Sequence, residues 1–218
     1  MKNILCYGDS NTWGYDYTQY IPEIEAAKRL PFDERWPGIL QNNLGDEYRI
    51  IEDALNARTC MYEDPYDQYR NGFKSLQVAL DANAPLDMII IQMGCNELKD
   101  YFRLSAEMIA CDIEMLVKAA KTSYYHYPAP KILLIAPAPV DKDIENMIFG
   151  YCFGPEAYNK SVKLGALCKK IAENHGCGFV DCAELDFKLN KLDGLHYCRE
   201  DHQKLGDAVT KEVIKMFS

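Results

Sequence analysis

The chain has 218 residues, of which 48% are hydrophobic and 26% are charged, and its formal net charge is −9. This composition is ordinary for a globular protein, and the length fits a single domain over residues 1–218. The negative charge disfavours non-specific binding to nucleic acid or to an anionic membrane surface, because both need clustered Lys and Arg. No apolar run reaches the roughly 18 residues of a membrane-spanning helix.

The nine cysteines are scattered along the chain, and several lie in strand-like or helix-like runs, among them Cys6, Cys111 and Cys168. An odd number of scattered cysteines indicates reduced thiols, buried or half-buried, in a reducing compartment. The first residues, 1–7, are too few and too quickly polar for a secretory signal. We therefore expect a cytoplasmic protein that needs neither a disulfide nor a metal to fold.

The first half of the chain is predicted to alternate strand and helix. Residues 3–7 form a short apolar run, and residues 88–93 are nearly all apolar, as expected for a strand covered on both faces. Residues 36–44 carry apolar side chains at helical spacing, and Gly45 follows as a cap. In chain order, this half is predicted to hold a strand at 3–7, a helix at 36–44, a strand at 48–51, a helix at 72–80 and a strand at 88–93.

The second half continues the alternation. Ser105 precedes a long helical pattern and can cap it, because its hydroxyl can accept a hydrogen bond from the first turn. In chain order, this half is predicted to hold a helix at 105–121, a strand at 131–136, a helix at 156–174, a short strand at 178–181 and a helix at 199–216.

Five strands separated by helices predict an α/β fold. Parallel strands need crossover connections, and helices supply them on both faces of the sheet. We therefore expect a three-layer α/β/α sandwich with a doubly wound, five-stranded parallel sheet in flavodoxin-like order. Ligands of such sheets bind beyond the carboxyl ends of the strands. The long segments 15–35 and 141–155 fall outside the alternation and are expected to form lids, substrate walls or interfaces.

Three segments near predicted element ends carry groups suited to acyl transfer. Ser10 follows the first strand, where its hydroxyl can reach the rim of the sheet beside free helix N–H groups. Gly94 and Asn96 follow the third strand, and the Asn amide can donate to an oxyanion. Asp193 stands three residues before His196 and can orient its imidazole. Each segment alone could be a turn or a cap, but together they supply nucleophile, oxyanion donor, base and orienting carboxylate.

These segments resemble sequence blocks of the SGNH hydrolase superfamily, also called GDSL esterases. The matching stretches are ILCYGDSNTWGYD (4–16), IIIQMGCNELK (89–99) and DGLHY (193–197). The chain is also similar to the intracellular arylesterase and acyltransferase subgroup, through the stretches ERWPGIL (34–40), IIEDALNARTC (50–60), RNG (70–72), KDYFR (99–103) and YPAPKILLIAPAP (127–139). The resemblance covers nearly the whole chain in order and implies the SGNH hydrolase fold.

The resemblance also implies roles for individual residues. It makes Ser10 the nucleophile, His196 the general base and then general acid, and Asp193 the residue that orients His196. The implied oxyanion hole consists of the backbone N–H groups of Ser10 and Ala57 and the side chain of Asn96. The residues expected around the substrate pocket are Asp9, Asn11, Trp13 and Gly94.

Three positions differ from the family pattern. Asn11 stands where many members have Leu, Ala54 where the family often has Gly, and Glu97 where Asp is usual. Ala54 disfavours a positive-φ turn at that position and so weakens the assignment of Ala57. The longer Glu97 is expected to shift a hydrogen bond that braces the turn at Asn96. None of these changes removes a catalytic group.

We therefore expect a serine esterase that hydrolyses or transfers short acyl groups, acetyl above all, with no cofactor and no metal. Its expected substrate is a small-molecule ester, with acetylated carbohydrates among the candidates. Relatives of the subgroup tend to be oligomers, so a homo-oligomer is expected. The cluster of Trp13, Tyr15 and Tyr17 and the aromatic residues of 147–153 could narrow the entrance to the site or form a subunit interface.

Three other functions remain open at the sequence level. Cysteines and histidines crowd the C-terminal region, but their spacing fits no zinc pattern. A phosphate cradle after the first strand lacks the glycine pattern and the lysine of a nucleotide-binding loop. A binding module could keep the fold without turnover. The residues of the metal candidate are Cys177, Cys182, His196, Cys198 and His202.

Otherwise His202 is expected to be a surface or packing residue, and His126 and His175 are expected to face solvent.

Overall fold

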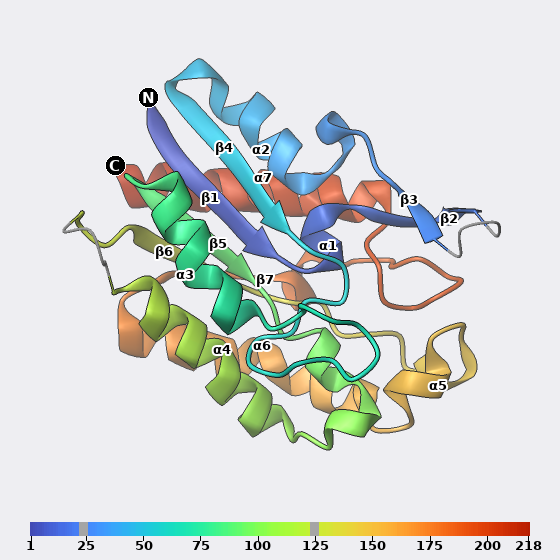
Figure 1. Ribbon diagram of the computed structural model, residues 1–218. Coiled ribbons are helices and arrows are strands. Elements are labelled where there is room, and N and C mark those ends of the chain that lie inside the picture. The colour runs from blue at the N-terminus through green and yellow to red at the C-terminus, as the bar shows by residue number, and fades with distance from the viewer. Residues whose placement is uncertain (22–25, 123–126) are drawn as a thin grey trace.

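The computed structural model describes residues 1–21, 26–122 and 127–218 (Figure 1). Its central sheet has five parallel strands in the spatial order β4-β1-β5-β6-β7. The strands are β1 (Lys2–Gly8), β4 (Tyr48–Ala54), β5 (Met88–Gln92), β6 (Lys131–Ala136) and β7 (Gly178–Asp181). Counted along the chain, this order is second, first, third, fourth, fifth, which is the predicted flavodoxin-like arrangement.

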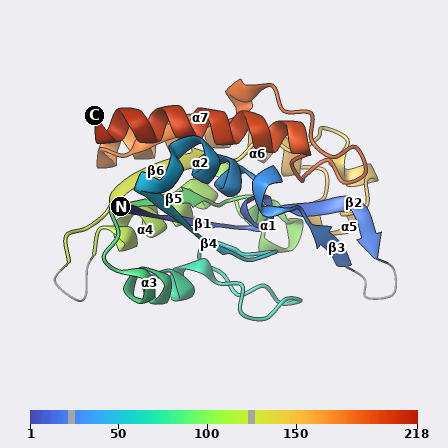
Figure 2. The same ribbon diagram turned by 90° about the horizontal axis from the view of Figure 1, so that it is seen from above.

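Helices cover both faces of this sheet, as the sequence predicts. The helices α2 (Trp36–Leu44) and α7 (Arg199–Phe217) pack on one face. The other face is covered by α3 (Gly72–Asn83), α4 (Ala106–Ala120) and α6 (Ala157–His175). Figure 2 shows α2 and α7 on one side of the strands and α3 and α4 on the other.

Successive side chains of the central strands are buried alternately against the helices on the two faces of the sheet. On β1, Ile4 and Cys6 pack in the layer of α2 and α7, and Leu5 and Tyr7 pack in the opposite layer. Successive strand residues point to opposite faces, so a strand covered on both faces must be apolar along its whole length. This explains why an unbroken apolar run marks β5 in the sequence.

The element boundaries agree with the prediction to within about a residue, except at the ends of α3, which continues to Asn83, and of β4. Ser105 caps α4 by accepting a hydrogen bond from Met108 N (3.2 Å), and α2 ends at Gly45. The strand β4 continues to Ala54, three residues beyond the predicted end. The last residues of β4 include Glu52 and Asp53, whose charges make this part of the sequence look unlike a buried strand. In the structure, each of them bonds to an arginine.

Two segments outside the sheet have structure that the alternation did not predict. Within residues 15–35, β2 (Tyr15–Ile21) and β3 (Ala26–Arg29) form an antiparallel pair. Within residues 141–155 lies the short helix α5 (Gly150–Phe153). Both lie with α1 (Ser10–Trp13) at the end of the molecule toward which the strands β1 and β4 point (Figure 1).

All nine cysteines are free, and most are buried or half-buried as expected. Cys111 is exposed on α4, so the expectation of a buried or half-buried thiol is wrong for this residue. His175 was expected to face solvent, but it is half-buried, with Nε2 2.7 Å from Glu114 Oε1. His126 lies outside the described residues. Among the helices of the described ranges, none has the length and apolar character needed to cross a membrane.

Candidate active site

Three polar side chains from the two ends of the chain form a hydrogen-bonded row beyond the carboxyl end of the sheet. His196 Nε2 lies 2.9 Å from Ser10 Oγ, and His196 Nδ1 lies 2.9 Å from Asp193 Oδ2. All three residues are buried. The structure thus brings together, through their side chains, the three residues that the sequence singles out for acyl transfer.

The position of Ser10 follows from a tight turn after β1. Asp9 caps α1, because its side chain accepts a hydrogen bond from Asn11 N (2.9 Å). A Cβ at Gly8 would lie 2.0 Å from Thr12 Oγ1, so only glycine fits where the strand meets the helix. The turn therefore sets Ser10 at the rim of the sheet.

The side chain of Asn11 connects this turn to the loop that carries His196. Its Oδ1 accepts a hydrogen bond from Tyr197 N (3.0 Å), and its Nδ2 donates to Leu195 O (3.4 Å). Asn11 is itself buried, so these bonds form away from bulk water, where an unpaired amide would be costly. Asn11 thus bonds to the residues on both sides of His196, whereas the sequence analysis expected it in the substrate pocket.

Asp193 determines which ring nitrogen of His196 carries the proton. Burial alone would raise the pKa of Asp193, but hydrogen bonds from the His196 ring and from the N–H groups of His196 and Leu195 outweigh it, and the pKa is lowered. An ionised carboxylate can only accept hydrogen bonds, so Nδ1 must carry the proton. Nε2 is then free to accept the hydroxyl proton of Ser10.

Two further groups lie on the wall of the cavity beside Ser10, namely Ala57 and Asn96. Asn96 donates one amide hydrogen bond to Arg58 O (3.0 Å), which leaves its second N–H for a ligand. No hydrogen-bond partner is found for the backbone N–H of Ala57 among the described residues. Ala57 has a φ of 60°, so the positive-φ turn occurs here, whereas Ala54 is the regular last residue of β4.

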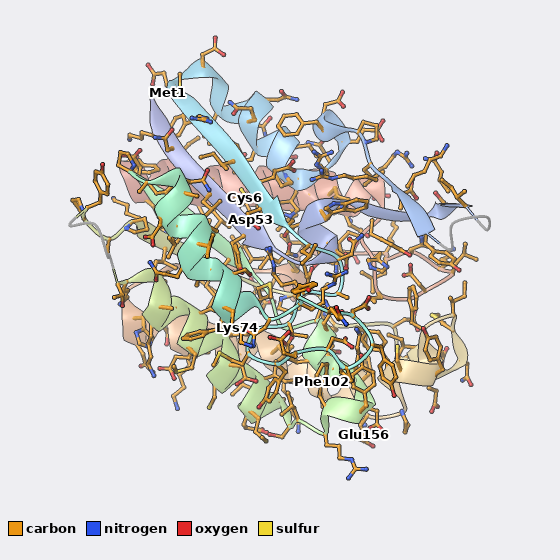
Figure 3. The ribbon with its side chains drawn as sticks, in the orientation of Figure 1. Met1, Cys6, Asp53, Lys74, Phe102 and Glu156 are labelled. Carbon is orange, nitrogen blue, oxygen red and sulfur yellow. The ribbon has the colours of Figure 1, made fainter. Side chains whose placement is uncertain are left out.

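Arg58 fixes this turn against the ends of two strands. Its guanidinium donates to Gly8 O (3.1 Å) and to both the backbone and the side chain of Asp53. Figure 3 labels Asp53, which lies near the end of β4. The Arg58 guanidinium also lies 4.2 Å from the centre of the Tyr7 ring, a cation–π contact. The Ala57 turn is therefore tied to the strand that leads into Ser10.

Glu97 links the segment that carries Ala57 to the segment that carries Asn96. Its buried carboxyl accepts a hydrogen bond from Cys60 N, so it bridges to the segment that carries Ala57. Within the described part of the chain, no partner is found for its second oxygen. Burial, together with the charges of Asp9 and Asp112, raises the pKa of Glu97 to about 7 against the opposing hydrogen bonds.

The cavity beside Ser10 has a volume of about 320 Å³. Tyr15 and Phe149 also line it, with ring centres 4.3 Å and 5.9 Å from that of His196. They come from the two long segments that were expected to include substrate walls. The sequence indicates that aromatic residues of these segments could narrow the entrance, and the structure places these two rings on the cavity wall.

Four residues expected around the pocket do not line this cavity in the described structure. Asp9 and Asn11 hold the turn and the His196 loop. Trp13 packs under the Arg29 guanidinium, which lies 5.0 Å from its ring centre. Gly94 has a φ of 111°, and a Cβ there would lie 2.8 Å from the Ile113 side chain. These four residues shape the site without reaching the cavity wall.

The histidine and cysteine cluster near the C-terminus has structural partners. His202 is fully buried, its Nδ1 accepts from Trp36 N (3.3 Å), and burial lowers its pKa to about 3. The Cys198 thiol bonds to Asp201 (3.1 Å) at the start of α7. Across residues 1–21, 26–122 and 127–218, no three His, Cys, Asp or Glu side chains are grouped to hold a metal ion.

Comparison with known proteins gives relatives over the whole chain. A family model described as the GDSL-like lipase/acylhydrolase family matches residues 6–207. The solved structure of Est24, a carbohydrate acetylesterase from Sinorhizobium meliloti, is 34% identical, with a TM-score of 0.88 over 99% of this chain and 100% of that one. The native aryl esterase of M. smegmatis is 32% identical, with a TM-score of 0.89 over 99% of both chains. No match is found among curated protein sequences.

Proposed function

Since the chain belongs to the GDSL-like lipase/acylhydrolase family and is a carboxylic ester hydrolase, we propose that it cleaves short acyl esters, acetyl esters above all, through an acyl-enzyme on Ser10. The observation that supports this most strongly is the row of 2.9 Å contacts from Ser10 through His196 to Asp193. That row gives a hydroxyl an adjacent base whose tautomer is fixed.

In the first half of the reaction, Ser10 Oγ attacks the ester carbonyl carbon while His196 Nε2 takes the hydroxyl proton. Asp193 stabilises the imidazolium that forms. The tetrahedral intermediate then collapses, the bond between the carbonyl carbon and the alcohol oxygen breaks, and His196 gives its proton to that oxygen. The acyl group remains as an ester of Ser10, and the alcohol leaves.

In the second half, a water molecule attacks the acyl carbon as His196 takes one of its protons. The bond to Ser10 Oγ breaks, and His196 returns the proton to that oxygen, which regenerates the enzyme and releases the acid. An alcohol in place of water would give acyl transfer by the same steps.

In both halves, negative charge develops on the carbonyl oxygen. The backbone N–H groups of Ser10 and Ala57 and the free amide N–H of Asn96 are the donors for it in this proposal. Support comes from the shared cavity wall of the three residues and from the uncommitted N–H groups of Ala57 and Asn96. Arg58 and Glu97 position these donors through the backbone.

The size of the acyl group is inferred from the cavity. Its 320 Å³ lies near the lower end of the roughly 300–1,000 Å³ range of small-molecule sites. The rings of Tyr15 and Phe149 contact the His196 ring and narrow the space around the reacting atoms. We expect acetyl esters to turn over faster than octanoyl esters, and the reverse order would exclude this assignment. The homo-oligomeric state and the cytoplasmic location stay predictions.

The direct test is hydrolysis of p-nitrophenyl acetate by the wild type and by Ser10→Ala. Loss of the nucleophile should lower kcat by several orders of magnitude. Ser105→Ala is a matched control, because Ser105 caps α4 at the surface and takes no part in the site. If wild type and Ser10→Ala are folded and equally slow, the binding-module alternative replaces the esterase.

A further inference from the structure

A second cavity adjoins the one beside Ser10. Its volume is about 330 Å³, and four residues line both cavities. Ser10 and His196 line only the first, so the second cavity offers space for a part of the substrate that does not react. The four shared residues are Asp67, Lys99, Tyr151 and Cys152.

Tyrosine rings form much of the second cavity. Tyr66, Tyr101 and Tyr151 all line it, and Tyr66 meets Tyr101 edge to face at 5.2 Å between ring centres. Tyr66 is 80% exposed and Tyr151 is 87% exposed. Such rings offer apolar surface to an aliphatic and to an aromatic alcohol alike, so selection between alcohols must come from the polar groups of the cavity.

A buried carboxylate lies behind the wall of this cavity. Asp64 lines neither cavity, and its Oδ2 accepts hydrogen bonds from Lys99 Nζ (2.8 Å) and from the Tyr101 hydroxyl (2.7 Å). Burial would raise the pKa of Asp64, but these two bonds and one from Tyr66 N outweigh it, and the pKa is lowered. The ionised carboxylate therefore holds the ammonium group and the Tyr101 ring in place before a ligand arrives.

Lys99 lines both cavities, and its ammonium group has N–H donors to spare. An ammonium group carries three N–H donors and no acceptor. One N–H of Lys99 bonds to Asp64, and within the described part of the chain no second hydrogen-bond partner is found for Nζ. The Tyr101 ring centre lies 5.8 Å from Nζ, near the outer limit of a cation–π contact. At least one N–H is therefore left for an acceptor that enters the cavity.

The charges around the two cavities cancel. Lys99 is balanced by Asp64, and Arg70 lies beside Asp67, with 3.9 Å between the charged atoms. This second pair is loose, and 49% of the Asp67 side chain is exposed, so water can solvate its carboxylate and a contact to it discriminates little between alcohols. Only 10% of the Lys99 side chain is exposed, so its spare N–H groups depend on what fills the cavity.

We propose that the second cavity binds the alcohol half of the ester and that Lys99 determines which alcohols are accepted, because it donates a hydrogen bond to an uncharged acceptor oxygen on that half. This inference rests on the proposed function, in which the acyl group is small and the alcohol is the larger half. An ether, hydroxyl or carbonyl oxygen beside Nζ replaces the water that the alcohol displaces. A pure hydrocarbon alcohol displaces the same water and leaves the N–H unpaired, which is unfavourable.

The test compares cyclohexyl acetate with tetrahydropyran-3-yl and tetrahydropyran-4-yl acetate. The last two esters replace one ring methylene by an ether oxygen and match the first in size. For the wild type, kcat/KM of the better tetrahydropyranyl ester should exceed that of cyclohexyl acetate roughly tenfold, because a hydrogen bond from a charged donor is gained. Initial rates of acetate release measure this for all three esters.

The double variant Lys99→Met/Asp64→Asn tests the role of the residue. It removes the ammonium group and its buried countercharge together, so neither charge is left unpaired. The preference for the tetrahydropyranyl ester should disappear, whereas turnover of cyclohexyl acetate should stay close to that of the wild type. Lys74→Met is the matched control, since Lys74 pairs with Glu63 (2.6 Å) at the surface and lines neither cavity. The ratio compares two substrates on one protein, so partial unfolding of a variant leaves it unchanged.

The inference is overturned if the wild type shows no preference among the three neutral esters, or if the double variant keeps the wild-type preference or slows all three esters equally. It is also overturned if 4-acetoxycyclohexanecarboxylate is preferred to all of them, because Lys99 would then act as an unbalanced cation. These outcomes differ from failure of the proposed function, in which the wild type hydrolyses none of the acetyl esters or Ser10→Ala remains as active as the wild type.

Discussion

The row of Ser10, His196 and Asp193 and the second cavity lie at the same end of the molecule but are built in opposite ways. The row is buried, its polar atoms have partners within 3 Å, and its residues lie at the start of α1 after β1 and in the loop before α7. The second cavity is walled by tyrosines from a loop and two short helices, of which Tyr66 and Tyr151 are exposed, and one of its ion pairs is loose.

We infer from this difference that the row determines the rate of the reaction, whereas the second cavity determines the selectivity between esters. A reacting group must be held within a fraction of an ångström, which rigid element ends can do. Contacts to the alcohol half can be looser and can lie on loops, where substitution leaves the fold intact. Changes in the row should therefore slow every ester alike, whereas changes in the second cavity should alter the ratio between esters.

The largest effect is expected from the row itself. His196→Ala should lower kcat for all esters by roughly 10³- to 10⁶-fold, and the double variant with Ser10→Ala should be no slower than either single variant, because the residues act as one unit. Steady-state kinetics on aryl and sugar acetates measures this. Additive losses in the double variant would show that the two residues act separately.

A smaller uniform loss is expected at the oxyanion donors. Asn96→Ala removes the amide that faces the cavity and should lower kcat by roughly 10²- to 10³-fold with little change in KM, because the donor acts on charge that develops in the transition state. The same kinetic assay applies. A rise in KM at unchanged kcat would instead assign Asn96 to ground-state binding.

Substitutions at Asn11 test whether its side chain positions the loop of His196 relative to Ser10. Asn11→Leu removes both bonds to the His196 loop and should lower kcat about 10- to 100-fold for all esters, since a misplacement of about 1 Å has effects of this size. Asn11→Asp keeps the acceptor for Tyr197 N and loses only the bond to Leu195 O, so its loss should be smaller. Equal losses in the two variants would contradict this role.

Glu97 should have the least effect on turnover but a distinct effect on stability. Its pKa is raised to about 7 in the folded protein, chiefly by burial, so the folded state holds a proton that the unfolded state releases above about pH 4.5. Stability should therefore fall as pH rises from about 4.5 to about 7, by up to about 1.4 kcal/mol per pH unit from this group.

Urea unfolding of the wild type and Glu97→Gln at several pH values measures this contribution. The variant should lose stability less steeply with rising pH, although part of the slope remains because burial also raises the pKa values of Asp9 and Asp112, each to about 6. An unchanged slope would show that Glu97 is ionised in the folded protein at low pH.

A part of the structure can be predicted when it requires a recognisable pattern in the sequence. The doubly buried strands are visible because covering both faces requires an unbroken apolar run, as in β5. Ser10, Asn96, Asp193 and His196 stand out because together they supply groups suited to acyl transfer near predicted element ends and match blocks of the family. The charged end of β4 is hidden, because its carboxylates are paired with Arg35 and Arg58 only in the folded structure.

The positive-φ turn and the second cavity lie beyond what sequence reasoning can reach. An alanine at φ 60° looks like any other alanine, so sequence reasoning considers a positive-φ turn only at position 54, where Ala disfavours it, and does not expect the one at Ala57. The second cavity is assembled from Tyr66 and Lys99, which lie on two separate loops, and from Tyr151 on the short helix α5. Their proximity depends on tertiary packing, and no local pattern encodes it. The same holds for Asn11, whose two partners lie 184 and 186 residues away.

The most direct test of the central claim is labelling with a p-nitrophenyl alkylphosphonate, which forms a stable adduct with an activated serine. The account predicts stoichiometric release of p-nitrophenolate, complete loss of esterase activity, and a phosphonyl group on the Ser10 peptide by mass spectrometry, with no labelling of Ser10→Ala. Labelling of another residue, or full activity after Ser10 is modified, would contradict it.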